Sequence, residues 1–270
     1  MSRTHPTTSE FLASLYDPHL EREFFSRIIL PNGSVKSTSE HRLDDLNVLA
    51  LPYVRQLSSP VRILDVAASS GVSSAEWHEQ LTSEGIQFSL TATDLTVNAY
   101  HRKLGLAEAI LDKKLNFIHL SLAGRGMPPK APWPIGFIPS LLKRYLAFRM
   151  ALGAKYNVPI KLLTKRLRDG NFAIVEDDLL NGDGLKEDFD VIRAANILNV
   201  SYFSESILRR MISNLKRRLS NRGLLIACRT KADRSNHGTV FQLQSDSFTA
   251  LARIGDGSEV EHLVNTLSSR

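Results

Sequence analysis

The sequence predicts an α/β fold in which helices cover both faces of a mostly parallel β-sheet. Short apolar runs rich in β-branched residues alternate with segments whose apolar residues recur every three or four positions. The last two apolar runs are instead joined by a short polar turn, which is typical of a hairpin. This alternation favours one parallel sheet with an antiparallel end.

The N-terminal region has the periodicity of helices. One helical face is predicted by apolar residues at three-to-four spacing, at Leu43, Leu46, Leu49, Tyr53 and Leu57. An earlier apolar stretch over residues 24–30 also suits a helix, and the turn signal Pro31-Asn32-Gly33 ends it. We therefore expect residues 1–58 to form a helical cap.

The short apolar runs predict seven strands. Five of them, at residues 61–67, 88–94, 172–176, 189–195 and 222–228, would be parallel. Two more, at residues 239–243 and 248–254, would form an antiparallel C-terminal hairpin. Residues 205–219 carry apolar side chains on one side and suit a helix between the fourth and fifth strands.

Residues 101–170 interrupt this alternation and are far longer than an ordinary connection between strands. Five of the eleven prolines fall between Pro128 and Pro139, and residues 137–152 have a helical pattern. Between Ser121 and Gly170 there are ten basic residues and one acid, a balance of +9, whereas the whole chain carries +6. We expect a basic helical insertion within a single domain of residues 1–270.

The composition is that of a globular protein, with 43% hydrophobic residues, 23% charged residues and a mean hydropathy of −0.14. The sequence contains no run of 18 uncharged apolar residues, and residues 1–10 lack the layout of a secretory signal. We expect a cytoplasmic protein. Cys228 is the one cysteine, and its apolar surroundings in the sequence predict a small buried side chain and not a nucleophile.

Polar residues follow four consecutive predicted strands. Asp65 ends the first, Asp94 ends the second, Asp177 follows the third and Asn196 follows the fourth. Because the carboxyl ends of parallel strands share one edge of a sheet, where open α/β sheets bind ligands, these residues are expected to lie together. Each residue alone also fits a structural cap or turn, but their joint placement predicts a binding site.

The loop after the first strand supports this prediction. Its small residues, Ala67, Ser69 and Gly71, allow the backbone to approach a ligand, and the helix that follows offers free amide groups. A tight structural turn explains the same loop without any ligand. The pattern Gly-x-Gly-x-x-Gly is absent, which argues against a nicotinamide-dinucleotide site.

This constellation resembles the class I S-adenosylmethionine-dependent methyltransferases. The loop Asp65-Val-Ala-Ala-Ser-Ser-Gly71 matches the family's Asp/Glu-x-Gly-x-Gly-x-Gly, with alanine and serine in place of the first two glycines. Asp94 matches the ribose-binding acid, and Asp177, with Asp178 as second choice, matches the adenine-side residue. Residues 189–203 are similar to the chemotaxis-receptor methyltransferase type. The resemblance covers residues 60–100 and 171–260.

The resemblance implies a Rossmann-like seven-stranded sheet that binds S-adenosyl-L-methionine. Asp65 would orient the loop, Gly71 would let the methionine part approach, Asp94 would bind ribose, and Asn196 would complete the crevice. Alanine and serine at positions 67 and 69 are tolerated in such a loop only if the backbone angles there are ordinary.

No catalytic residue is assigned from the sequence. A carboxylate acceptor needs no base, whereas a hydroxyl or ammonium acceptor would have to lose a proton. The candidate bases are His237, His101 and His119, each of which also fits an ordinary surface or loop histidine. No cluster of His, Cys and Asp residues has the spacing of metal ligands.

The acceptor and the role of the basic insertion stay open. We expect transfer to a small-molecule or lipid-like acceptor. The insertion would be a helix packed on the domain, a substrate lid or a peripheral contact with an anionic membrane surface, and nucleic acid is the less favoured partner. Two rivals are a catalytically inactive Rossmann-like binding protein and an RNA methyltransferase.

Overall fold

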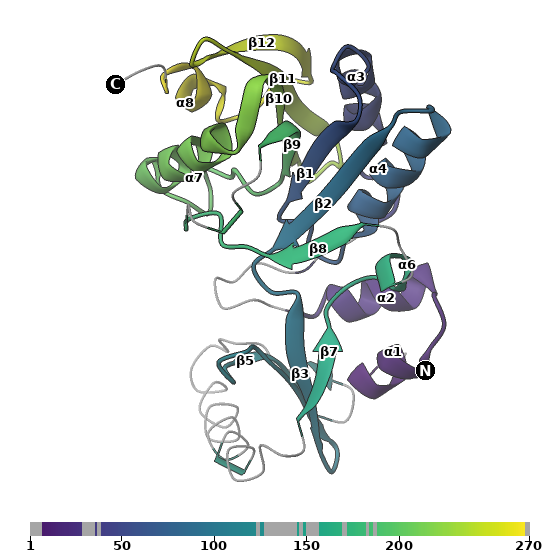
Figure 1. Ribbon diagram of the computed structural model, residues 1–270. Coiled ribbons are helices and arrows are strands. Elements are labelled where there is room, and N and C mark those ends of the chain that lie inside the picture. The colour runs from purple at the N-terminus through teal and green to yellow at the C-terminus, as the bar shows by residue number, and fades with distance from the viewer. Residues whose placement is uncertain are drawn as a thin grey trace. The chain divides into compact units, whose positions relative to one another are not determined.

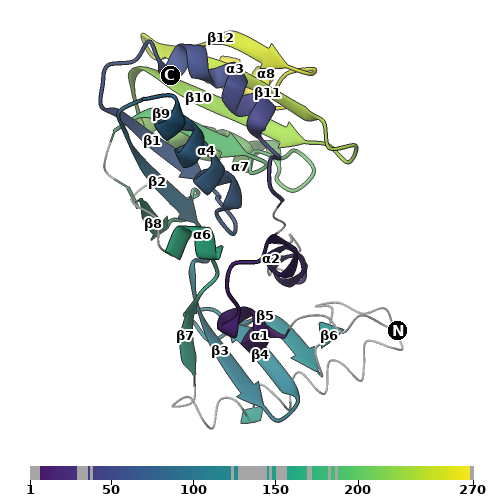
Figure 2. The same ribbon diagram turned by 90° about the vertical axis from the view of Figure 1, so that its right-hand side faces the viewer.

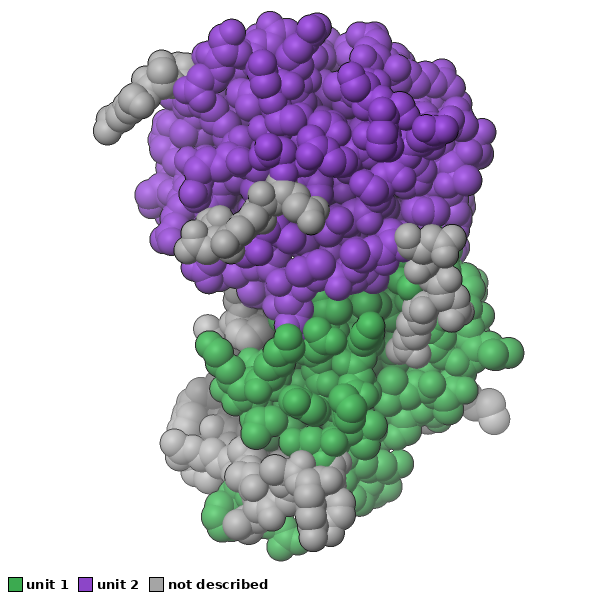
Figure 3. Space-filling view, viewed as in Figure 1, with its two compact units in different colours: residues 1–39, 96–168 green, residues 40–95, 169–270 purple. Residues whose placement is uncertain are grey.

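A computed structural model of the chain describes residues 7–28, 36, 39–122, 125–126, 145, 148–149, 157–168, 172–181, 184–185 and 188–267 (Figure 1). The chain divides into two compact units, which Figure 3 shows in different colours. The smaller comprises Met1–Ser39 and Thr96–Arg168, and the larger comprises Glu40–Leu95 and Asp169–Arg270. The expected single domain over residues 1–270 stays a prediction.

The larger unit is built on a seven-stranded sheet in the order β12-β11-β10-β9-β1-β2-β8. Strands β8, β2, β1, β9 and β10 pair in parallel, whereas β11 is antiparallel to both β10 and β12. This confirms the predicted Rossmann-like, mostly parallel sheet with an antiparallel C-terminal hairpin. The strands are β1 (Val61–Val66), β2 (Phe88–Asp94), β8 (Ala173–Glu176), β9 (Phe189–Ala195), β10 (Leu219–Thr230), β11 (Asn236–Gln244) and β12 (Ser247–Ile254).

Helices cover both faces of this sheet. Helices α3 (Asp44–Val54) and α4 (Val72–Ser83) contribute to one apolar core, and Figure 2 shows them side by side over the strands. Helices α7 (Glu205–Arg217) and α8 (Glu261–Asn265) contribute to the other. Residues of β1 divide between the two cores, because successive side chains of a strand point to opposite faces. Within the described residues, no helix combines the length and apolar composition that crossing a bilayer requires.

The smaller unit contains a five-stranded antiparallel sheet in the order β6-β5-β4-β3-β7. Its strands are β3 (Asn98–Leu104), β4 (Ala107–Leu111), β5 (Phe117–Leu122), β6 (Arg125–Gly126) and β7 (Val158–Lys161). Helices α1 (Thr8–Ala13) and α2 (Pro18–Phe25) and the short α6 (Lys165–Arg168) also belong to this unit.

The described part of the insertion corrects the expectation of a helical segment over residues 101–170. The hydrophobic pattern does not predict strand β3, because the strand contains the consecutive polar residues His101, Arg102 and Lys103. The first two of them are buried. Tertiary packing overrides local pattern here. The helix expected over residues 137–152 lies almost entirely outside the described residues.

The helices expected over residues 1–58 are present among the described residues, but they divide between the two units. Helices α1 and α2 belong to the smaller unit, where Phe11 stacks on Phe24 with ring centroids 3.9 Å apart. The buried carboxylate of Glu108 in β4 accepts hydrogen bonds from the backbone of Thr8 and the hydroxyl of Ser9, each at 2.7 Å. Helix α3 belongs to the larger unit.

A buried ion pair joins four elements of the larger unit. The guanidinium of Arg193 in β9 donates to both carboxylate oxygens of Asp65 in β1, at 2.9 and 2.6 Å. It also donates to the side chain of Asn47 in α3 at 2.8 Å and to the carbonyl of Ser73 in α4 at 3.0 Å. Its carbon lies 4.2 Å from the ring centroid of Trp77, so the planar group stacks on the indole.

Replacing Arg193 by methionine is expected to lower the free energy of unfolding by roughly 3–5 kcal/mol, because the Asp65 carboxylate would stay buried without its partner. Urea denaturation measures the loss. Asp65→Asn should restore part of it when combined with Arg193→Met. Arg209→Met is the control, since Arg209 forms an exposed pair with Glu205, and its cost should be within about 0.5 kcal/mol. Equal losses in Arg193→Met and the control would contradict the expectation.

Candidate functional site

The predicted site residues lie at the carboxyl edge of the larger sheet. Register pairs Val66 with Thr93 of β2 and with Ala194 of β9, and pairs Asp94 with Glu176 of β8. The four strand ends are therefore level. Asp65, Asp94, Asp177 and Asn196 and the loop that follows β1 occur at this edge, as expected from the sequence.

Three of the five residues in the loop between β1 and α4 have a left-handed backbone conformation. The φ angles are +57° at Ala67, +59° at Ser69 and +88° at Gly71. The condition that positions 67 and 69 have ordinary angles is therefore not met. A left-handed angle costs a residue with a β-carbon roughly 1–2 kcal/mol, and such strain is concentrated at functional sites.

Asp94 holds this loop in place. Its carboxylate accepts a hydrogen bond from the backbone N–H of Ser69 at 2.8 Å, and only 8% of the residue is exposed. The N–H of Ala68 donates to the carbonyl of Thr93 at 2.8 Å. In the same loop the hydroxyl of Ser70 is buried and has no hydrogen-bond partner within the described structure. At the ends of β1 and β2, the carboxylate of Asp94 and the loop backbone that it binds thus lie near a buried hydroxyl without a hydrogen-bond partner, that of Ser70.

Helix α4 begins directly after this loop. Its N-cap is Gly71, and no side chain caps the first turn. The uncapped amides leave a positive end at the carboxyl edge. The hydroxyl of Ser74, in this first turn, donates to Asp65 at 2.5 Å. Asp65 therefore faces the protein interior and orients the start of α4.

Asp177 is held in an ion pair. Its carboxylate accepts two hydrogen bonds from Arg218, at 2.5 and 3.0 Å, and both side chains are buried. The second-choice residue, Asp178, accepts from the N–H of Leu180 at 3.0 Å and stabilises a turn. An adenine amine could reach Asp177 only if the ion pair opened. Both acids thus have partners within the chain, and their assignment to the adenine stays a prediction.

Asn196 connects two strand ends. It has a φ of +63°, its side-chain oxygen accepts from the N–H of Thr230 at 2.7 Å, and its own N–H donates to the carbonyl of Cys228 at 2.7 Å. These bonds join the end of β9 to β10. The structure gives Asn196 a local structural role, and its assignment to a crevice stays a prediction.

Both ring nitrogens of His237, at the start of β11, have hydrogen-bonding partners. Nδ1 accepts the N–H of Asp256 at 2.9 Å, and Nε2 lies 3.1 Å from the hydroxyl of Ser235. The ring packs on Gly255, which has a φ of +56° and where a β-carbon would come within 2.6 Å of Nδ1. With Nδ1 accepting from the backbone, His237 is held as a donor and is not poised as a base.

His101 and His119 lie in the sheet of the smaller unit, in β3 and β5, where both are paired with Ile110 of β4. Burial lowers the pKa of His101, and burial together with the charge of Arg27 lowers the pKa of His119 to about 4. Both rings are therefore neutral at pH 7. In the larger unit Cys228 is buried, as expected, and burial raises the pKa of its thiol to about 12.

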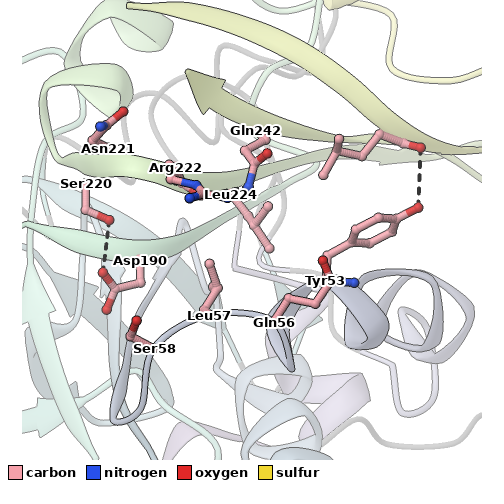
Figure 4. A pocket seen from close by; sticks show the side chains of 11 residues that line it. Tyr53, Gln56, Leu57, Ser58, Asp190, Ser220, Asn221, Arg222, Leu224 and Gln242 are labelled. Carbon is pink, nitrogen blue, oxygen red and sulfur yellow. Dashed lines mark hydrogen bonds between the residues drawn. The ribbon is translucent and has the colours of Figure 1, made fainter. Parts of the chain in front are cut away.

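A cavity of about 390 Å³ opens at the opposite, amino edge of the larger sheet (Figure 4). Its lining comes from the end of α3, the starts of β9 and β10, and strands β11 and β12, and includes Tyr53, Gln56, Asp190, Asn221, Arg222 and Gln242. The carboxylate of Asp190 is paired with Arg62 and accepts a bond from Ser220 at 2.9 Å. The predicted site residues do not line this cavity.

Glycine at position 67 or 69 is expected to raise the free energy of unfolding by roughly 1 kcal/mol, because glycine adopts a left-handed φ without a steric penalty. Urea denaturation of Ala67→Gly and Ser69→Gly measures the gain. Ala68→Gly is the matched control, since φ there is not positive, and it should lower stability slightly. Loss of stability in all three variants would contradict the strained loop.

The low pKa of His119 predicts that the smaller unit loses stability as the pH falls from about 6.5 to about 4, since in that window the unfolded chain binds a proton that the folded unit excludes. The stabilising contribution, present above pH 6.5, corresponds to roughly 3 kcal/mol. His119→Gln should flatten this pH dependence in urea denaturation, whereas His19→Gln, at an exposed histidine of α2, should retain it. An unchanged profile in His119→Gln would disprove the assignment.

No family model matches the chain, and no curated protein matches it. The chain is similar to the N-methyltransferase NodS from Bradyrhizobium japonicum WM9 in complex with S-adenosyl-L-homocysteine, with 13% identity over 78% of this chain and 72% of that chain, at a TM-score of 0.36. It is similar to SAM-bound CalS10, an amino pentose methyltransferase from Micromonospora echinaspora, with 12% identity over 88% and 68% of the two chains, at a TM-score of 0.38.

A third similar structure is the CMeT domain of the citrinin polyketide synthase, with 16% identity over 68% of this chain and 33% of that chain, at a TM-score of 0.35. Similarities at these scores carry no argument about the activity of this chain. None of the three proteins is a chemotaxis-receptor methyltransferase, and the finer resemblance to that type has no support among them.

Proposed function

We propose that the chain binds S-adenosylmethionine at the carboxyl edge of the larger sheet and transfers its methyl group to a small-molecule or lipid-like acceptor. The observation that carries the proposal is the loop over residues 67–71, whose three left-handed residues are held by Asp94 beside the uncapped start of α4. Strain of this kind persists only where the surrounding structure enforces it, and it is concentrated at sites of function.

The residues of the β1–β2 side suit distinct parts of such a ligand. The carboxylate of Asp94 can accept hydrogen bonds from ribose hydroxyls, and the close backbone at Gly71 leaves room for the amino-acid part. When bound, a sulfonium supplies an electrophilic methyl group, and holding the acceptor in line with it accounts for much of the rate. Because His237 has both ring nitrogens engaged, we favour an acceptor that needs no protein base, such as a carboxylate.

The rival of an inactive binding protein rests on two observations. Alanine and serine hold angles that favour glycine, and Asp177 is engaged by Arg218. Two other hypotheses, an RNA methyltransferase and a peripheral contact with an anionic membrane surface, rest on the basic segment of residues 121–170. This segment lies largely outside the described residues. They stay predictions from the charge of the sequence.

Calorimetric titration with S-adenosylmethionine and S-adenosylhomocysteine tests the proposal. Asp94→Ala should weaken binding by about 1.5–3 kcal/mol, roughly 10- to 150-fold, the range for hydrogen bonds to a charged group. Asp190→Ala is the control, since Asp190 is an acid of the same sheet at the opposite edge. Thermal unfolding of both variants checks that they fold.

Absence of binding in the unaltered protein, or equal affinity in both variants and the unaltered protein, would contradict the proposed site. Binding without formation of S-adenosylhomocysteine, across small acids and lipids as acceptors, would instead favour the inactive binding protein.

A further inference from the structure

Arg42 is a cation without a partner in the described structure. It lies two residues before α3, is partly buried, and its guanidinium makes no hydrogen bond or ion pair within the described residues. Its Nε is fully buried and unsatisfied. A buried guanidinium nitrogen without an acceptor is rare in proteins, so solvent or a ligand from outside the chain has to supply the acceptors of this group.

The acids near Arg42 are already used. Asp65 is held by Arg193 through two hydrogen bonds, and Glu76 accepts the N–H of His41 at 2.8 Å. Burial lowers the pKa of Arg42 and the charge of Arg193 lowers it further, and the opposing effects of Cys228, Asp65 and Glu76 do not restore it. Two guanidinium groups thus share surroundings in which only Arg193 is fully matched by protein acceptors.

Two interactions connect Arg42 with residues at the carboxyl edge. Its carbonyl accepts from Asn236, at the start of β11, at 2.7 Å, and its guanidinium interacts electrostatically with Asp65 at the end of β1. Asp65 in turn accepts a hydrogen bond from Ser74 in the first turn of α4. This helix has 12 residues, and no side chain caps its N-terminus. The buried, unpartnered hydroxyl of Ser70 lies one residue before the N-cap of that helix. A guanidinium, a helix N-terminus and a free hydroxyl all suit an anion.

We infer that Arg42 is an anion-binding residue of the carboxyl-edge site and takes a carboxylate or phosphate group of the ligand bound there. Its terminal nitrogens retain access to solvent, since the residue is only partly buried, and a guanidinium binds both oxygens of such a group at once. The identity of the ligand that carries the anion rests on the proposed function, whereas the anion site itself does not.

The first experiment compares S-adenosylmethionine with its decarboxylated form in calorimetric titrations. The unaltered protein should prefer the carboxylate-bearing compound by on the order of tenfold or more, as for a charge-assisted bidentate contact. In Arg42→Met the preference should fall to about one, and Arg42→Lys should retain part of it. Arg55→Met is the control, because Arg55 ends α3 in an exposed pair with Glu84, and it should keep the full preference.

The second experiment is independent of the cofactor. Thermal unfolding is followed in phosphate, acetate or chloride at equal ionic strength. Phosphate or acetate should raise the midpoint in the unaltered protein and in Arg55→Met, but not in Arg42→Met. Without these anions, Arg42→Met should be at least as stable as the unaltered protein, since it removes an unmatched buried charge. A residue with a merely structural role would show the reverse.

The outcomes separate the two ideas. A carboxylate preference that depends on Arg42 identifies the cofactor as the source of the anion, and stabilisation by phosphate or acetate without that preference identifies a free anion or the acceptor. If S-adenosylmethionine does not bind but the anions stabilise through Arg42, the proposed function fails and the anion site stands. If neither the preference nor the stabilisation depends on Arg42, the inference is overturned even where S-adenosylmethionine binds.

Discussion

The carboxylate of Asp65 lies at the end of the central strand β1 with 3% of the residue exposed, and this constraint governs its surroundings. A buried charge costs several kcal/mol unless it is paired, and Arg193 supplies the partner from the adjacent strand β9. Arg193 is buried too, so it requires acceptors from α3 and α4. The contacts that satisfy one charge thus fix the position of two helices on two strands, and with it the point where α4 begins.

The shape of the loop over residues 67–71 follows from these fixed ends. The chain must pass from the end of β1 to the start of α4 in five residues, and it does so with left-handed angles at positions 67, 69 and 71. Alanine and serine bear strain there that glycine would avoid. The hydrogen bonds of Ala68 to Thr93 and of Ser69 to Asp94 hold the loop in this form. Rigid flanking elements therefore sustain a backbone that the loop sequence by itself disfavours.

The larger sheet could be predicted from the sequence because each of its strands is a local apolar run and its hairpin has a polar turn. The smaller sheet could not, since β3 carries polar residues such as His101 that become buried only through packing with distant segments. The same limit applies to the site. The pattern locates Asp65, Asp94 and Asp177 at strand ends, but not their partners. Arg193 and Arg218 are 128 and 41 residues away along the chain from the acids they bind.

These partners neutralise two of the acidic residues at the carboxyl edge. Asp65 with Arg193, and Asp177 with Arg218, form two internal ion pairs whose charges cancel. On the β8 side, the pair engages the side chain that would meet adenine. Arg42, two residues before α3, adds a guanidinium with no acceptor among the described residues. A ligand that matches the proposed site should carry hydroxyl groups toward Asp94 and a negative group toward Arg42.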